Sequence, residues 1–261
     1  MRKRIGFGLA VVVLVVLGVL IWQVLQVHQL DPVIDGKPLT HWMEGYVGGP
    51  SATEAANQVL EKVGTNAIPT LLRMLQKRDS AFKREVMGWA QKQHLIRVHY
   101  IPAEKRNQAA YFAFLRLGAR ADSAVPGLIQ IFELNISPFS QQCTAGSLAS
   151  VGPAANVAIP ILVNPLANTN PLVRQDIVNS LGRLHSEPEL VVPTLTRALN
   201  DPEARVRLTA CLALGQVGAG AKQAVTALAK ALNDPEPSVA GMAAMALRQI
   251  DPEAAAKAGT Q

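Results

Sequence analysis

Apolar positions recur along this chain at a spacing much longer than one turn of a helix. The recurrence has gaps of 54, 34, 33, 33 and 33 residues, between Leu60, Phe114, Leu148, Leu181, Leu214 and Leu247. Most members of this series have further apolar residues four positions before and three positions after them. Offsets of three and four place side chains on one face of a helix. The pattern predicts one apolar helical stripe in every repeated unit.

A second pattern predicts that each unit contains another helix. Glycine follows the stripe at Gly64, Gly118, Gly152 and Gly218, where a helix end favours a left-handed residue. His185 and Asp251 take this place in the other units. An Ile or Val then precedes Pro-x-Leu, beginning at Ile68, Val125, Ile159 and Val192, and Val225 begins a fifth copy with Thr for Pro. Proline is tolerated in the first turn of a helix, so we expect a second helix to start at this motif. The last unit ends before such a motif and is therefore expected to be half a helix pair.

Two Asn-Asp-Pro-Glu segments stand at the repeat period, beginning at Asn200 and Asn233. We expect Asp201 and Asp234 to cap the next helix, with proline at its first position and glutamate near the positive end of its dipole. Recurrence at the repeat period favours this interpretation over a metal or acid/base cluster.

These elements resemble short HEAT-like repeats, which occur in bacterial proteins and in phycobilin lyases, over about residues 51–256. Val173-Arg174 and Val206-Arg207 match the Val-Arg that the family often has near the start of its first helix. The resemblance implies an all-α fold, a right-handed α-solenoid of about five and a half antiparallel helix pairs whose second helices line a concave face. The ankyrin and tetratricopeptide landmarks are missing. Fold analogy does not transfer an activity.

Residues 5–27 contain no charged side chain and follow Arg2-Lys3-Arg4. A helix of that length spans about 34 Å, enough for a hydrocarbon core of about 30 Å. We therefore predict an uncleaved signal anchor within residues 1–30, with a cytoplasmic N-terminus and an extracytoplasmic repeat domain. The alternative, a cleaved signal peptide, has a shorter apolar region that is followed by a cleavage site of small residues. In this chain, the residues at the end of the apolar run are bulky.

Three further segments are expected after the anchor. Residues 31–50 form a linker with a short helix capped by Thr40, and Gly36 to Trp42 is similar to an element of anchored bacterial HEAT-like proteins. Residues 51–261 form the repeat domain. The 54-residue gap accommodates an insertion near 80–102, with a helix from Ser80 to about Gln93 that places Phe82, Val86 and either Trp89 or Ala90 on one face.

Charge singles out the region of this insertion. The chain has a net charge of +6, and residues 73–106 hold nine bases and three acids, whereas residues 107–261 are balanced. Repeat insertions often lie on a binding face. The predicted partner-binding residues are Arg73, Lys77, Lys83, Arg84, Trp89, Lys92, Arg97 and Tyr100. In the alternative interpretation, Phe82 and Trp89 plug a wide joint between units and the bases are only solvated.

No catalytic, metal or cofactor motif accompanies the repeats. A zinc-protease helix, a phosphate loop and a nucleophile elbow are all missing from the sequence. Cys143 and Cys211 lie two units apart, too far for a disulfide, and are expected to be buried thiols.

The sequence thus predicts a membrane-tethered, non-catalytic scaffold that needs no cofactor and binds a protein of unknown identity. The basic segment favours an acidic partner. Two alternatives stay open: an enzyme of the bilin-lyase kind, and a polyanion-binding protein that uses residues 73–106. The expected extracytoplasmic location counts against nucleic acid.

Overall fold

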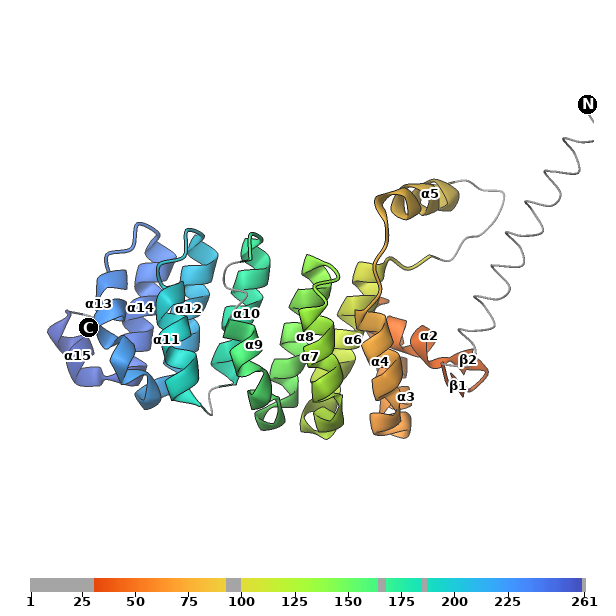
Figure 1. The fold of residues 1–261 in the computed structure, drawn as a ribbon, viewed down its shortest axis with the longest axis horizontal. Coiled ribbons are helices and arrows are strands. Elements are labelled where there is room, and N and C mark those ends of the chain that lie inside the picture. The colour runs from red at the N-terminus through yellow and green to blue at the C-terminus, as the bar shows by residue number, and fades with distance from the viewer. Residues whose placement is uncertain (1–30, 93–99, 164–167, 185–186, 260–261) are drawn as a thin grey trace, which may run out of the picture.

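Antiparallel helix pairs stand side by side in one row in the computed structural model, which describes residues 31–92, 100–163, 168–184 and 187–259 (Figure 1). The first helices are α3 (Pro50–Val63), α6 (Ala103–Leu117), α8 (Pro138–Val151), α10 (Pro171–Arg183), α12 (Ala204–Val217) and α14 (Pro237–Ile250). The second helices are α4 (Ile68–Leu75), α7 (Val125–Glu133), α9 (Ile159–Val163), α11 (Pro188–Ala198) and α13 (Val225–Ala231), and α15 (Pro252–Lys257) follows α14. Each first helix packs against the next one, which confirms an all-α solenoid.

The periodic apolar series forms the centre of the core. Leu60, Phe114, Leu181, Leu214 and Leu247 are fully buried, and Leu148 is 1% exposed. They belong to one continuous hydrophobic cluster that runs through every pair. The predicted register of the first helices is therefore confirmed.

The glycines that follow the stripe adopt positive φ, as predicted. Gly64, Gly118, Gly152 and Gly218 have φ of 61°, 55°, 81° and 64°. Their ψ values lie between −137° and −143°, outside the left-handed helical region. A side chain is disfavoured there, so glycine allows the sharp turn into the 3-10 segments that join the helices, η2 (Gly64–Ala67), η3 (Gly118–Ala124), η4 (Pro153–Ala158) and η6 (Gly218–Ala224).

The Asn-Asp-Pro segments differ from the sequence prediction. The following helices begin only at Ala204 and Pro237, so the prolines lie before them and the aspartates are not their caps. Asp201 accepts the Glu203 N–H at 2.9 Å, and its carboxylate receives both the Nε and Nη2 of Arg174 at 2.8 Å. Because Arg174 is largely buried, its charge needs a partner within the protein, and the aspartate of the next unit supplies it.

The N-terminal segment packs on the first pair. Strands β1 (Val33–Ile34) and β2 (Lys37–Pro38) form a hairpin, followed by α2 (Leu39–Met43) and η1 (Glu44–Val47). Thr40 was expected to cap a helix; instead its N–H donates to the Asp31 carboxylate at 3.2 Å. Leu39 and Met43 are fully buried in the same core as the repeats.

The predicted single-pass membrane topology is contradicted. None of the helices in the described ranges is long and apolar enough to cross a bilayer. The segment assigned as the anchor, residues 5–27, lies outside those ranges.

Candidate partner-binding surfaces

Helix α5 (Ala81–Lys92) stands away from the row of helix pairs (Figure 1) and none of its residues is buried. Phe82 is 77% exposed, Val86 43% and Trp89 71%. Their spacing of four and three residues places them on one face, which we call the α5 stripe. The stripe therefore offers two aromatic rings and a branched side chain to solvent.

These exposures contradict the interpretation of Phe82 and Trp89 as a plug between units. A plug would bury both rings, whereas no element of the described chain packs extensively against α5. The 3.6-residue pattern correctly predicted the helix but not whether another element covers its apolar face.

The base of the insertion is held by Asp79. Its carboxylate accepts hydrogen bonds from the Tyr100 hydroxyl at 2.5 Å and the Ala103 N–H at 2.6 Å, and lies 2.7 Å from the Lys83 ammonium. Burial raises the pKa of Asp79, but these three donors together outweigh it and hold the pKa at about 2. Lys83 and Tyr100, which the sequence singled out for partner binding, thus have partners within the chain.

Two other predicted arginines also have internal neighbours. Arg73 donates to the Thr70 hydroxyl at 2.8 Å and lies 3.9 Å from the Asp31 carboxylate. Arg84 lies 3.8 Å from Glu104, and both side chains are more than half exposed, so this ion pair is weak. Arg84 remains accessible to a partner.

Lys77 and Lys92 are exposed, and within the described ranges neither ammonium group has a carboxylate in ion-pair range. Partial desolvation lowers the pKa of Lys77, and the nearby charges of Arg106, Arg73 and Lys83 lower it further. Bases therefore converge at the foot of α5. Arg97, also predicted as a contact, lies outside the described residues.

Sequence reasoning missed three cavities that follow one another along the first helices. The first, about 470 Å³, lies at α3 and α6 and includes Phe112 and Arg116. The second, about 190 Å³, lies among α6, α8 and α10 and also includes Phe112. The third, about 380 Å³, lies among α10, α12 and α14. All three are on the first helices, whereas the family resemblance had drawn attention to the second helices.

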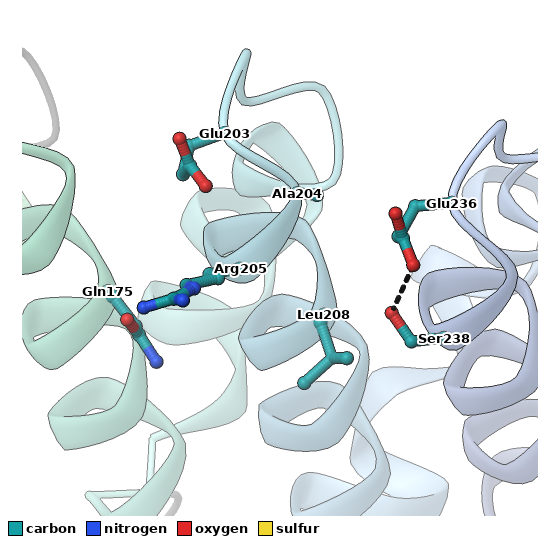
Figure 2. Close-up of a pocket in the computed structure, with 7 residues that line it drawn as sticks. All are labelled: Gln175, Glu203, Ala204, Arg205, Leu208, Glu236 and Ser238. Atoms are coloured by element: carbon teal, nitrogen blue, oxygen red, sulfur yellow. Dashed lines mark hydrogen bonds between the residues drawn. The ribbon is translucent and has the colours of Figure 1, made fainter.

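The third cavity is lined by charged side chains of both signs. Figure 2 shows Arg205 pointing toward Gln175, with Glu203 above them at the start of α12. On the α14 side, the Ser238 hydroxyl donates to Glu236 at 3.1 Å. Since carboxylates and a guanidinium share this space, the cavity has no strong preference for either sign of charge.

The second cavity contains the Asp176 carboxylate, which has no ion-pair or hydrogen-bond partner among the described side chains. Asp176 of α10 lines it together with Tyr111 and Phe112 of α6 and Phe139 at the start of α8. Burial raises the pKa of Asp176 to about 6, and among the described residues no hydrogen bond or neighbouring charge acts against it. We call this space the Asp176 cavity.

The described side chains contain no group of three or more His, Cys, Asp and Glu that could hold a metal ion. Cys143 and Cys211 are buried free thiols, as expected, and burial raises the pKa of each to about 12. Both thiols therefore stay protonated at neutral pH.

Comparison with known proteins places HEAT repeats in the C-terminal part of the chain. The HEAT-repeat family model matches residues 192–258, from within α11 to the end of α15. This match, with the row of helix pairs, supports a HEAT-like repeat protein. No curated protein matches the chain.

Solved structures that resemble the chain include two engineered proteins of the Northeast Structural Genomics Consortium. One is 18% identical with a TM-score of 0.45, covering 84% of this chain and 97% of its own. The other is 20% identical with a TM-score of 0.46, covering 85% of this chain and 66% of its own.

Proposed function

We propose that this protein is a protein-interaction scaffold whose α5 docks an amphipathic, acidic segment of a partner. HEAT repeats suggest an interaction scaffold rather than an enzyme. The observation that carries the finer proposal is the α5 stripe, because exposed Phe and Trp side chains on one helix face are unusual for a surface without a partner.

The stripe and the bases beside it have complementary roles. Aromatic side chains provide most of the binding energy at many interfaces, so Phe82 and Trp89 would supply the contact area. Lys77, Arg84 and Lys92 would attract carboxylates and speed encounter. A partner helix with apolar residues on one face and acids at its edges satisfies both requirements.

Capture of proteins by the full chain, quantified by mass spectrometry with and without nuclease treatment, tests this proposal. Phe82→Ala with Trp89→Ala, and separately Lys77→Glu with Arg84→Glu and Lys92→Glu, should each remove the same acidic proteins. Lys83 is left unchanged because a glutamate there would face the buried Asp79 carboxylate. Both sets should leave the melting temperature unchanged, since all these side chains are exposed.

Matched controls separate a local effect from a general one. Lys222→Glu with Lys230→Glu and Lys257→Glu gives the same net charge from exposed lysines elsewhere, and Leu134→Ala with Val157→Ala removes exposed apolar groups elsewhere. Both controls should keep the captured proteins. Identical capture by the α5 variants and the parent would refute the proposal, and capture that disappears with nuclease would indicate a nucleic-acid ligand instead.

A further inference from the structure

The Asp176 cavity has the size of one long side chain rather than of a cofactor. Its volume is about 190 Å³, below the range of about 300–1,000 Å³ that small-molecule sites occupy. It opens between three consecutive first helices, and the neighbouring cavities continue on both sides along the row. An extended segment lying on this face could thus place one residue in the cavity.

A glycine shapes the aromatic wall of this cavity. A Cβ atom at Gly146 would lie 2.7 Å from Cε2 of Tyr111, so the missing side chain allows the Tyr111 ring to lie against α8. The Tyr111 and Phe112 rings stand 5.5 Å apart at an angle of 37°. Together with Phe139, they line the same cavity as Asp176.

Asp176 differs from the aspartates that the fold pairs with its own side chains. Asp201 and Asp234 are bound by arginines, and Asp79 by three donors, whereas Asp176 has no such partner among the described residues. The Asp176 side chain is only partly buried, and no fully buried side-chain oxygen of the described residues lacks a partner, so its unpaired carboxylate is open to the cavity. The cavity therefore lacks a cation that the rest of the fold supplies to its aspartates.

We propose that the Asp176 cavity binds the cationic head of an arginine or lysine side chain from an extended segment of a partner protein. The carboxylate would pair with the charge, and the aromatic rings would contact the cation and its apolar stem. An anion would be repelled by Asp176, and an apolar side chain would leave the carboxylate desolvated. The inference does not depend on the α5 stripe, which lies on a separate helix.

The other groups around Asp176 agree with a cationic ligand. Cys143 of α8 and Tyr111 of α6 are the other titratable residues lining the cavity, and the thiol is neutral at pH 7. On α12, which packs on α10, Arg207 is bound to Asp234 and Arg205 lines the neighbouring cavity. No cation of the described chain therefore occupies the place of the ligand.

An immobilised library of short extended peptides, each with central Arg, Lys, Gln or Glu in randomised flanks, tests the proposal with the full chain. The parent should retain Arg and Lys peptides at least about tenfold more than Gln or Glu peptides. Asp176→Asn should remove this preference, and Gly146→Ala, which displaces Tyr111, should weaken it. Glu189→Gln, an equal change of charge at an exposed position of α11, should have no effect.

Three results would overturn the proposal. The first is retention by the parent that does not depend on the central residue, including retention of no peptide. The second is a preference that Asp176→Asn leaves unchanged. The third is competition by free arginine amide at the same concentration as the best peptide of the library in soluble form, which would indicate a small-amine site. A melting curve of each variant shows that loss of preference is not loss of fold.

Discussion

Arg174 and Asp201 lie 27 residues apart in the sequence and form a bidentate ion pair, with both N···O distances at 2.8 Å. The remaining Nη1 of Arg174 donates to the Asn168 carbonyl at 2.8 Å. Arg207 and Asp234 repeat the pair in the next unit, again at 2.8 Å. Each arginine thus binds its own unit through a carbonyl and the following unit through a carboxylate.

Breaking one such pair should destabilise the stack. Asp201→Ala leaves the Arg174 charge buried without its partner, and we expect the free energy of unfolding to fall by about 3–5 kcal/mol. Urea unfolding measures this. Arg205→Ala, which removes an exposed arginine from the adjoining helix, should cost well under about 1 kcal/mol. An equal loss in both variants would show that the pair has no special role.

The apolar register of the first helices predicts a contrast within one helix. Leu214→Ala removes a fully buried side chain and should lower the free energy of unfolding by about 2–5 kcal/mol. Leu212→Ala, at a position 38% exposed on the same helix, should cost less than about 1 kcal/mol. Thermal unfolding of the two variants compares them directly. A smaller loss at Leu214 than at Leu212 would contradict the register.

Asp79 should make the protein sensitive to acid. Its pKa is about 2 in the folded chain and near 3.8 when unfolded, so the unfolded state binds the proton first as pH falls. The contribution of Asp79 to the free energy of unfolding should be complete above about pH 4 and should decrease progressively toward pH 2. The decrease should be about 2 kcal/mol, since one pKa unit corresponds to about 1.4 kcal/mol. Asp79→Asn should flatten this part of the profile of unfolding free energy against pH. A parent profile as flat as the variant's would refute the role of Asp79.

Asp176 should act in the opposite direction and at higher pH. Its pKa of about 6 exceeds the usual 3.8, so the folded state holds the proton more tightly and stability decreases as pH rises from about 4 to 6. The loss should be up to about 3 kcal/mol. Asp176→Asn should therefore be more stable than the parent at pH 7 and similar to it at pH 4. Unfolding curves at the two values test this, and a less stable variant at pH 7 would contradict it.

Features that repeat could be predicted from the sequence, and features that join distant units could not. The burial of Leu181 and Leu214 follows from a spacing visible in the chain. The role of Asp201 could not be predicted, because its partner Arg174 precedes it by 27 residues and helix capping explained the same motif locally. The helix of the insertion was predicted, but a periodic face does not show whether another element covers it.

The Asp176 cavity was the least predictable feature. It requires Tyr111, Gly146 and Asp176 from three units, and only their packing brings these side chains together. A single aspartate within one helix has no local sequence pattern that marks it as unpaired.

Asp79 also has a consequence for how the fold could be rebuilt. Because its carboxylate binds the N–H of Ala103 directly, the chain leaves and re-enters the stack at almost one point. Segments whose ends meet in this way are tolerant of replacement. Residues 80–99 can thus be regarded as an exchangeable cassette: another helix, or a short turn, could be grafted between the same ends while the helix pairs on either side stay in register.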